Sequence, residues 1–260
     1  MRFVRYRAGA GARWGTHDPS TDLVQPLVGT PWLDPATAAE PPVPFAGLTL
    51  LAPCAPSKIV AVGRNYRAHA AELGNEVPKI PLLFLKPPSS IVGPEAAIEL
   101  PAQSGRVEHE AELGIVIGAR LCDATPAEAA AAIFGATAVN DVTARDLQRA
   151  DVQFTRAKSF DTFCPVGPAL VTGLDTRDLA VVARVDGEVR QDGRTRDMVF
   201  GIAELLAFAS SIMTLEPGDL VATGTPDGVG PLLAGQRVEV EVEGVGVLAN
   251  PVRARGLRPR

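Results

Sequence analysis

The segment Glu108–Glu112, EHEAE, places a carboxyl side chain at every second position. Side chains two residues apart lie on the same face of a β-strand, about 7 Å from one another, so a strand here would gather three acids on one side. Two of these carboxylates could converge on a hard divalent cation, which prefers oxygen ligands. The alternative is the solvated face of an edge strand, which is how we interpret the alternating acids of 238–243. The opposite face continues into apolar positions typical of a core, namely Leu113, Ile115 and Ile117.

Another carboxyl group ends a separate predicted strand, TAVND over 137–141. If Asp141 meets the acids of 108–112, the carboxylates form a set of oxygen ligands on one side of a cation, and water and substrate fill the other positions. The alternative is that Asp141 only caps the short helix predicted over 143–151. The spacing of residues leaves both interpretations open.

His69 and Glu72 lie three residues apart in RAHAAELG, which predicts a brief helix closed by Gly74. Residues at this spacing share one helix face, so Glu72 can orient the imidazole and raise its basicity, as a general base requires. The alternative is an exposed ion pair on a surface helix. Because the chain has only three histidines, this pair is a candidate for catalysis.

The glycine-rich segment TGTPDGVG over 223–230 is a candidate anion-binding loop. It lacks the GK[ST] of a phosphate-binding P-loop and the helix-opening context of a dinucleotide fingerprint. Its glycines allow backbone N–H groups to approach an anion closely. A turn with no ligand is the alternative.

The elements that must position these residues are mostly strands. Helices are few and do not alternate with strands, so we predict an α+β fold with a largely β core. Thr125 and Glu128 form a capping-box pattern with Pro126 at the first helical position. The pattern predicts strands at 59–62, 107–117, 137–141, 220–225 and 238–242, and helices at 125–135 and 201–213.

The two ends of the chain differ in pattern. Residues 1–52 hold short apolar runs separated by turn-forming residues and finish in a proline-rich stretch. We therefore predict a small, strand-poor N-terminal domain with a linker at 1–52, followed by a second domain at 53–260.

Composition excludes several classes of protein. A net charge of −5 over 260 residues, with no basic run, argues against nucleic acid as a partner. The N-terminus has no signal-peptide pattern, and no apolar stretch is long enough to span a membrane, so we expect a cytoplasmic protein. The odd number of cysteines, without a CxxC pair, predicts reduced thiols buried in the core: Cys54, Cys122 and Cys164.

Taken in this order, the motifs resemble the fumarylacetoacetate hydrolase family, specifically its single-module bacterial members of the acylpyruvase and 2-hydroxyhepta-2,4-diene-1,7-dioate isomerase types. The EHEAEL and NDVTARD motifs are the most specific of them. The resemblance covers about residues 58–252 and makes 53–260 a catalytic domain of this family. The matching segments are VGRNYRAHAAELG, FLKPPSSIVGP, VEHEAELGIVIG, NDVTARD, RAKSFDTFCPVGP and GDLVATGTPDGVG followed by EVEVEGVGVLANPV.

The resemblance implies mixed sheets rolled around the active site, a small N-terminal domain and a homodimer. It implies that Glu110, Glu112 and Asp141 bind Mg²⁺ or Mn²⁺, with Glu108 outside the ligand set. It also implies that His69 and Glu72 form a lid dyad and that Lys158 is the active-site lysine. Arg145 and Gln148 would contact the substrate, and Thr225 would be the loop residue that holds the substrate carboxylate.

These roles are chemically consistent with one reaction type. A 2-keto acid can chelate a cation through its carboxylate and 2-oxo oxygens, and the cation then stabilises the enolate formed when the C3–C4 bond breaks. His69, held by Glu72, could deprotonate the water that attacks C4. We therefore expect a metal-dependent hydrolase that cleaves a carbon–carbon bond in an acylpyruvate or another 2,4-diketo acid of the fumarylpyruvate type.

Neighbouring reactions remain as alternatives. Without water attack, the same site would decarboxylate or tautomerise oxaloacetate, or serve as an isomerase or decarboxylase for 2-hydroxyhepta-2,4-diene-1,7-dioate in aromatic catabolism. A non-catalytic metal and keto-acid binder is a remote alternative. His69 and Glu72 argue against it, because binding a keto acid requires a cation but no base.

Overall fold

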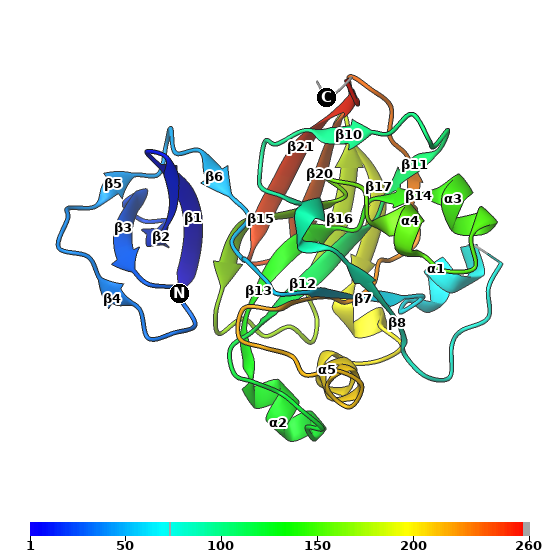
Figure 1. Ribbon diagram of the computed structural model, residues 1–260, viewed down its shortest axis with the longest axis horizontal. Helices are drawn as coiled ribbons and strands as arrows, with labels where there is room; N and C mark the ends of the chain where they lie inside the picture. The colour runs from blue at the N-terminus through cyan, green and yellow to red at the C-terminus, as the bar shows by residue number, and fades with distance from the viewer. Residues whose placement is uncertain (73, 257–260) are drawn as a thin grey trace.

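The computed structural model describes residues 1–72 and 74–256. The fold is mostly β, as predicted, and its largest sheet runs from the N-terminal part into the body of the molecule (Figure 1). In spatial order its strands are β4 (Ala36–Thr37), β3 (Leu23–Val28), β2 (Gly11–Asp18), β1 (Arg2–Ala8), β15 (Cys164–Val171), β13 (Ile133–Asn140), β12 (Ala111–Ile117), β18 (Leu220–Ala222), β7 (Ile59–Gly63) and β8 (Leu82–Lys86), while β5 (Val43–Pro44) pairs with β3, β6 (Leu50–Leu51) with β1, and β9 (Ile91–Val92) with β15.

Two smaller sheets and short helices surround the large sheet. One sheet has the order β10 (Ile98–Leu100), β21 (Gly246–Ala254), β20 (Arg237–Val242), β16 (Ala180–Val185) and β17 (Glu188–Arg194), and the other β14 (Thr143–Ala144), β11 (Val107–His109) and β19 (Gly230–Pro231). The helices are α1 (Arg67–Glu72), α2 (Pro126–Ala131), α3 (Arg145–Ala150), α4 (Thr155–Lys158) and α5 (Ile202–Ser210), with 3₁₀ turns η1 (Pro88–Ser90) and η2 (Thr195–Asp197).

The expectation of a strand-poor N-terminal segment is wrong. Strands β1, β2 and β3 form an antiparallel meander, and the turn-forming residues that interrupt the sequence mark its hairpins. Gly9 and Asp22 adopt positive φ angles of 58° and 54° in the two connections. Strand β1 also pairs with β15, at Arg2 with Val171 and Phe3 with Leu170, so the sheet is continuous with the rest of the molecule.

Three predicted elements end elsewhere than the pattern suggested. The strand predicted over 107–117 is interrupted at Glu110, where the chain leaves the β11 sheet and joins the large one as β12. The capping box of Thr125 and Glu128 forms, but α2 ends at Ala131, because the segment around Gly135 belongs to β13. Helix α5 ends at Ser210, which leaves Ile212 58% exposed outside the predicted apolar stripe.

Strand β12 is the centre of the fold and not an edge strand. It lies between β13 and β18 in the large sheet, and every residue of it is buried. Its apolar face packs against the β16–β20 layer and α5, as the alternation predicted. Burial on both faces excludes a solvated acidic face. The alternating acids of β20, by contrast, are partly exposed and form ion pairs with arginines.

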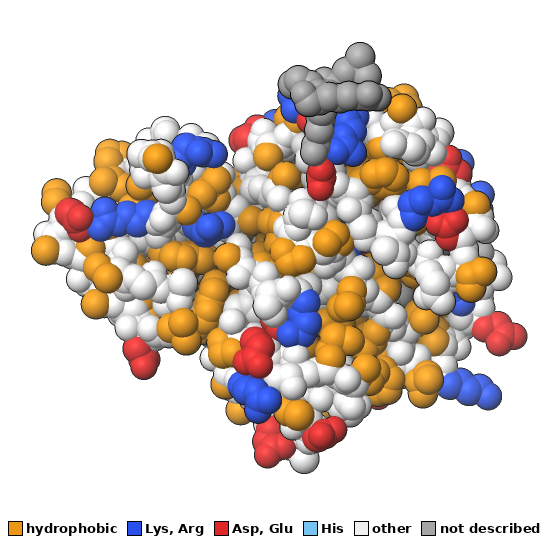
Figure 2. Space-filling model, in the orientation of Figure 1, with side chains coloured by type: hydrophobic (Ala, Val, Ile, Leu, Met, Phe, Trp, Pro, Cys, Tyr) orange, Lys and Arg blue, Asp and Glu red, His pale blue; other side chains and the backbone are white. Residues whose placement is uncertain are grey.

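The cysteines are only partly as expected. Cys54 and Cys164 are buried free thiols, and burial raises the pKa of Cys164 to about 12. Cys122 is exposed, because it lies in the connection between β12 and α2. In the described residues, no helix is long and apolar enough to cross a membrane. Figure 2 shows acidic and basic side chains interspersed over one face of the molecule.

Asp219 joins the start of the second domain to the large sheet. Its buried carboxylate accepts hydrogen bonds from the backbone N–H groups of Ser57, Lys58 and Glu216, and it pairs with the Lys58 ammonium. Burial would raise the pKa of Asp219, but these donors hold it below its ordinary value.

We predict that Asp219→Asn lowers the free energy of unfolding by about 2–3 kcal/mol at pH 7, because the amide leaves buried donors unpaired. Since the folded-state pKa of Asp219 is depressed, its contribution to the free energy of unfolding is present above about pH 4, the ordinary pKa of an aspartate. That contribution is lost as the pH falls through the lower folded-state pKa. Urea unfolding of both proteins at several pH values tests this. Asp175→Asn, which affects an exposed pair with Arg177, is the control and should change almost nothing. An equal loss from both variants would contradict the assignment.

Candidate active site

Three carboxylates from two strands meet beside β12. Glu110 occupies the break between β11 and β12, Glu112 is the second residue of β12, and Asp141 directly follows β13. The register of β12 and β13 pairs Ala111 with Asn140, and the Asp141 N–H donates to the Glu110 carbonyl at 2.9 Å. One ligand oxygen from each of the three acids lies within 4.8 Å of the others. The juxtaposition that the sequence analysis required is therefore present.

Basic side chains pack against this cluster. Lys158 donates to Glu110 at 2.7 Å and to Asp141 at 2.6 Å, and Lys86 donates to Asp141 at 2.6 Å. Arg145 pairs with both Glu108 and Glu110. The buried cluster thus contains four acids and three bases, namely Glu108, Glu110, Glu112 and Asp141 with Lys86, Arg145 and Lys158.

Glu110 and Glu112 differ in their electrostatic environment. Burial alone would raise the pKa of Glu110, but Lys158 and Arg145 beside it hold that pKa well below its usual value. Among the described residues Glu112 forms no ion pair, and its carboxylate accepts the Gly224 N–H at 2.9 Å. Burial, followed by repulsion from Asp141 and Glu110, raises the pKa of Glu112 well above its ordinary value.

The cluster therefore fits a divalent cation. Arg106, Arg145, Lys86 and Lys158 pair with the other acids, and Glu112 is the one carboxylate of the cluster without an ion pair among the described residues. A cation would relieve the repulsion that raises the Glu112 pKa. Because the donor atoms are all carboxylate oxygens, the set suits Mg²⁺ or Mn²⁺ better than metals that prefer thiolate or imidazole.

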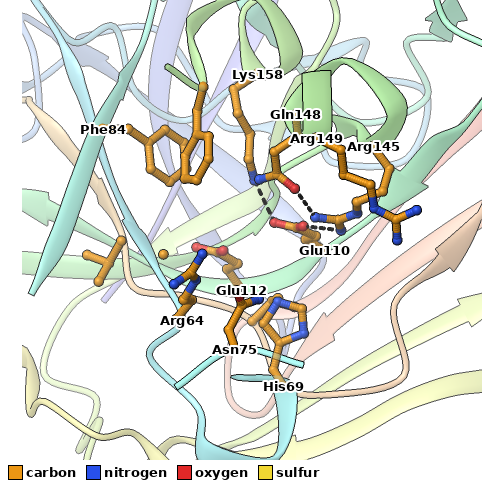
Figure 3. A pocket seen from close by; sticks show the side chains of 14 residues that line it. Arg64, His69, Asn75, Phe84, Glu110, Glu112, Arg145, Gln148, Arg149 and Lys158 are labelled. Carbon is orange, nitrogen blue, oxygen red and sulfur yellow. Dashed lines mark hydrogen bonds and ion pairs between the residues drawn. The ribbon is translucent and has the colours of Figure 1, made fainter. Parts of the chain in front are cut away.

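A pocket of about 250 Å³ opens over Glu110 and Glu112. Figure 3 shows the acids at its base, with Phe84 and Lys158 on one side and His69 opposite them. Its lining includes every catalytic and substrate-binding residue predicted from sequence except Glu72, namely His69, Arg145, Gln148, Lys158 and Thr225.

His69 and Glu72 contact each other on α1. His69 is buried, and its Nδ1 lies 3.1 Å from Glu72 Oε2, while Glu72 Oε1 accepts the Gly228 N–H at 3.0 Å. If Nδ1–H donates to the carboxylate, Nε2 is the ring nitrogen left for the pocket. Glu72 thus connects the short helix to the 223–230 loop, and the exposed ion pair considered from sequence alone does not describe this geometry.

Arg145 and Gln148 lie on α3 and contact one another. Gln148 Oε1 accepts from Arg145 Nη1, so the guanidinium of Arg145 is shared between Gln148 and the buried acids. Sequence reasoning missed Lys86, which donates to Asp141. One signal was available, because the chain has only four lysines against twenty-one arginines and three of the lysines, Lys58, Lys86 and Lys158, pair with aspartates.

Gln191 is a second residue that the sequence analysis missed. It is the buried member of an otherwise exposed strand segment, and its Nε2 donates to Thr225 Oγ1 at 2.7 Å and to the Pro226 carbonyl at 2.8 Å. Its Oε1 accepts the Ala111 N–H at 2.9 Å and lies 2.9 Å from His109 Nδ1. Since a carbonyl only accepts and a backbone N–H only donates, the amide orientation is fixed, and His109 must donate from Nδ1.

Comparisons with known proteins identify the family of the chain. The family model for the C-terminal domain of fumarylacetoacetate hydrolase matches residues 58–253, and the model for the Rv2993c-like N-terminal domain matches residues 1–53. The chain belongs to the fumarylacetoacetate hydrolase family, which confirms the resemblance seen in its motifs.

Relatives with named activities catalyse different reactions. Human mitochondrial oxaloacetate tautomerase FAHD2A is 45% identical over 231 residues, covering 84% of this chain and 74% of the relative. The structure of a 5-carboxymethyl-2-hydroxymuconate delta-isomerase from Mycobacterium smegmatis has a TM-score of 0.91 and 43% identity, covering 98% of this chain and 100% of that one. A 2-hydroxyhepta-2,4-diene-1,7-dioate isomerase from Mycobacterium marinum gives 0.90 and 40%, covering 99% and 100%.

We predict that His109 is neutral, with its proton on Nδ1, at pH 7 and well below the ordinary histidine pKa of about 6.5. Burial lowers the pKa of His109, and its Nε2 has no hydrogen-bond partner in the described structure. Side-chain ¹⁵N NMR measures both the tautomer and the titration. Gln191→Leu should abolish the preference for Nδ1–H. A wild-type Nε2–H tautomer would show that the Gln191 network is assigned wrongly.

Proposed function

We propose that this protein is an isomerase of the keto–enol type, which moves a proton next to the 2-oxo group of a 2-oxo acid bound at a divalent cation. The observation that carries the proposal is the buried set of Glu110, Glu112 and Asp141. Glu110 and Glu112 line a pocket that also holds His69, which is paired with Glu72. The tautomerase and isomerase relatives support this reaction over the hydrolysis that the sequence analysis placed first.

The three carboxylates would hold the cation, with Mg²⁺ or Mn²⁺ as the candidates. When bound, the cation supplies positive charge that stabilises the negative charge developing on the 2-oxo oxygen. Glu112 contributes the charge that no base of the described chain pairs with. Lys158 and Arg145 keep Glu110 ionised, and Lys158 and Lys86 orient Asp141.

His69 is the group positioned to move the proton. Glu72 accepts from Nδ1, which fixes the ring and leaves Nε2 to take a proton from the carbon beside the 2-oxo group and return it elsewhere. Because Glu72 also accepts the Gly228 N–H, the base is held over the pocket by two elements. His69 itself is buried, so its ring is confined by the surrounding protein.

Two other groups would bind the acid end of the substrate. Thr225 lines the pocket, and its hydroxyl donates to the Ala111 carbonyl and accepts from Gln191 Nε2, so it would redirect its proton from Ala111 to bind a carboxylate. Lys158 lies beside Glu110 with its ammonium 4.9 Å from the centre of the Phe84 ring, and it would balance negative charge that develops next to the acids.

Carbon–carbon hydrolysis of an acylpyruvate remains the second candidate. Its specific support is a similar structure named as a fumarylacetoacetate hydrolase, from Exiguobacterium antarcticum, at 37% identity and a TM-score of 0.88. The His69–Glu72 pair is compatible with it, because the same base could activate a water molecule as readily as it accepts a proton from carbon. The two reactions differ in products: isomerisation conserves the carbon skeleton, whereas hydrolysis releases two acids.

We predict that Glu112→Gln weakens Mn²⁺ binding by about 100-fold or more, since it removes the unbalanced ligand. The metal-free variant should be at least as stable as the wild type, because the folded state of the wild type raises the Glu112 pKa and is therefore destabilised when this group ionises. Mn²⁺ titration by calorimetry and thermal unfolding measure the two effects. Glu239→Gln, on a partly exposed strand position, is the control, and equal Mn²⁺ affinity in wild type and Glu112→Gln would refute the site.

We predict that the Mn²⁺-loaded protein in D₂O exchanges the C3 protons of a 2-oxo acid, and that His69→Ala slows this exchange by about 10²–10⁴-fold while Mn²⁺ binding is retained. Proton NMR follows the exchange, with Mn²⁺ alone as the background control. An exchange rate that survives His69→Ala would eliminate His69 as the base. Release of two acids from an acylpyruvate, without exchange, would instead select the hydrolase.

We also propose a homodimer. Strand β8 is the last strand of the large sheet, and a groove beside it is apolar, lined by Pro81, Leu83, Phe84, Leu85, Phe208, Ile212 and Met213. Light scattering should give twice the chain mass of 27.2 kDa at micromolar concentration, and Ile212→Lys should weaken association. A wild-type mass of 27.2 kDa would contradict the proposal.

A further inference from the structure

Two of the basic side chains that line the pocket form no ion pair among the residues that the structure describes. Five basic side chains line it, and three of them have protein partners: Arg145 and Lys158 pair with the buried acids, and His69 contacts Glu72. The other two, Arg64 and Arg149, form no hydrogen bond or ion pair in the described part of the chain. An unpaired guanidinium facing a pocket is suited to bind an anion.

Arg64 and Arg149 are placed differently. Arg149 is exposed on α3, whereas Arg64 is half-buried in the connection between β7 and α1. In Figure 3 the two lie on opposite sides of the carboxylates, and Arg64 points into the pocket. Partial burial makes Arg64 the better anion site, because a charge partly removed from water interacts more strongly with a bound counter-charge.

The backbone around Arg64 is fixed. Arg64 has a φ of 57°, in the left-handed region that residues with a side chain seldom adopt. The next residue, Asn65, is buried, donates to the carbonyls of Phe200 and Thr223, and accepts the Phe200 N–H at 2.9 Å. These bonds attach the Arg64 connection to the start of the 223–225 loop, so the backbone that carries the Arg64 side chain is held by buried contacts.

We propose that Arg64 binds a second carboxylate, at the far end of a 2-oxo dicarboxylic acid whose 2-oxo acid end lies at Glu110, Glu112 and Thr225. This inference rests on the proposed function and adds to it the residue that would bind the far carboxylate. The acid cluster and Thr225 serve the 2-oxo acid end, and Arg64 supplies a separate cation with no acid of its own. A planar guanidinium can form two parallel hydrogen bonds with a carboxylate, which selects a dicarboxylate over an acid that ends in a methyl group.

The test compares ligands that differ only at the far end. Isothermal titration of the Mn²⁺-loaded protein would use 2-oxoglutarate against 2-oxopentanoate, and the longer pair 2-oxoadipate against 2-oxohexanoate. The wild type should bind the dicarboxylate of at least one pair about tenfold more tightly than its matched monocarboxylate. Arg64→Asn should remove this preference while leaving monocarboxylate binding unchanged, and asparagine tolerates the left-handed backbone.

Control variants exclude indirect effects. Arg67→Gln removes an exposed arginine on α1 that does not line the pocket, and it should keep the wild-type preference. Arg64→Lys retains the charge but not the planar fork, so it should keep part of the preference. An unchanged melting temperature and Mn²⁺ affinity in Arg64→Asn would show that fold and cation site are intact.

Each outcome separates the two proposals. If the wild type binds both members of each pair equally, or if Arg149→Gln and not Arg64→Asn removes the preference, the Arg64 site is wrong while the proposed function stands. If Arg64→Asn weakens both ligands alike, Arg64 acts on the 2-oxo acid end and the proposal also fails. If the wild type binds neither member of either pair, the proposed function fails together with it.

Discussion

The structure depends on the burial of four carboxylates, of which Glu112 alone forms no ion pair among the described residues. Such a cluster is costly, because charges removed from water must be balanced by close counter-charges. Lys86, Arg106, Arg145 and Lys158 pair with the other three acids, whereas burial and the neighbouring acids raise the pKa of Glu112. The strands bring these acids together, because Glu110 lies where the chain passes from β11 to β12 and Asp141 directly follows the neighbouring strand β13. A bound cation would balance the charge of Glu112, so the acid that has no ion pair is also one that would hold the cation.

The surrounding contacts turn that cluster into an organised pocket. Glu72 joins α1 to the 223–230 loop, and Gln191 joins the loop to β12 through Thr225 and Ala111. Asn65 attaches the connection before α1 to Thr223. Elements far apart in sequence therefore hold the base, the acid-binding hydroxyl and the pocket wall in a fixed relation, which is what proton transfer to or from carbon requires.

Part of this arrangement was predictable from sequence. The period-two spacing of acids, the acid after TAVND and the His69–Glu72 spacing identified residues that the fold brings together, because local periodicity and strand ends constrain direction. The mostly β fold was predictable for the same reason. Other features depended on long-range pairing: the break at Glu110, the β1–β15 connection and the burial of β12 on both faces follow from how the sheets join. Gln191 and Lys86 were missed because neither lies in a local pattern that indicates its partner, although the scarcity of lysine was a weak signal for Lys86.

The most direct test of the account is the position of the cation. Anomalous diffraction at the manganese edge, from crystals grown with Mn²⁺ and oxalate as a stable mimic of the 2-oxo acid end, would locate it. The account predicts one strong peak per chain, in contact with carboxylate oxygens of Glu110, Glu112 and Asp141. A peak at other residues, or no peak at saturating Mn²⁺ with Lys158 still bridging Glu110 and Asp141, would contradict it.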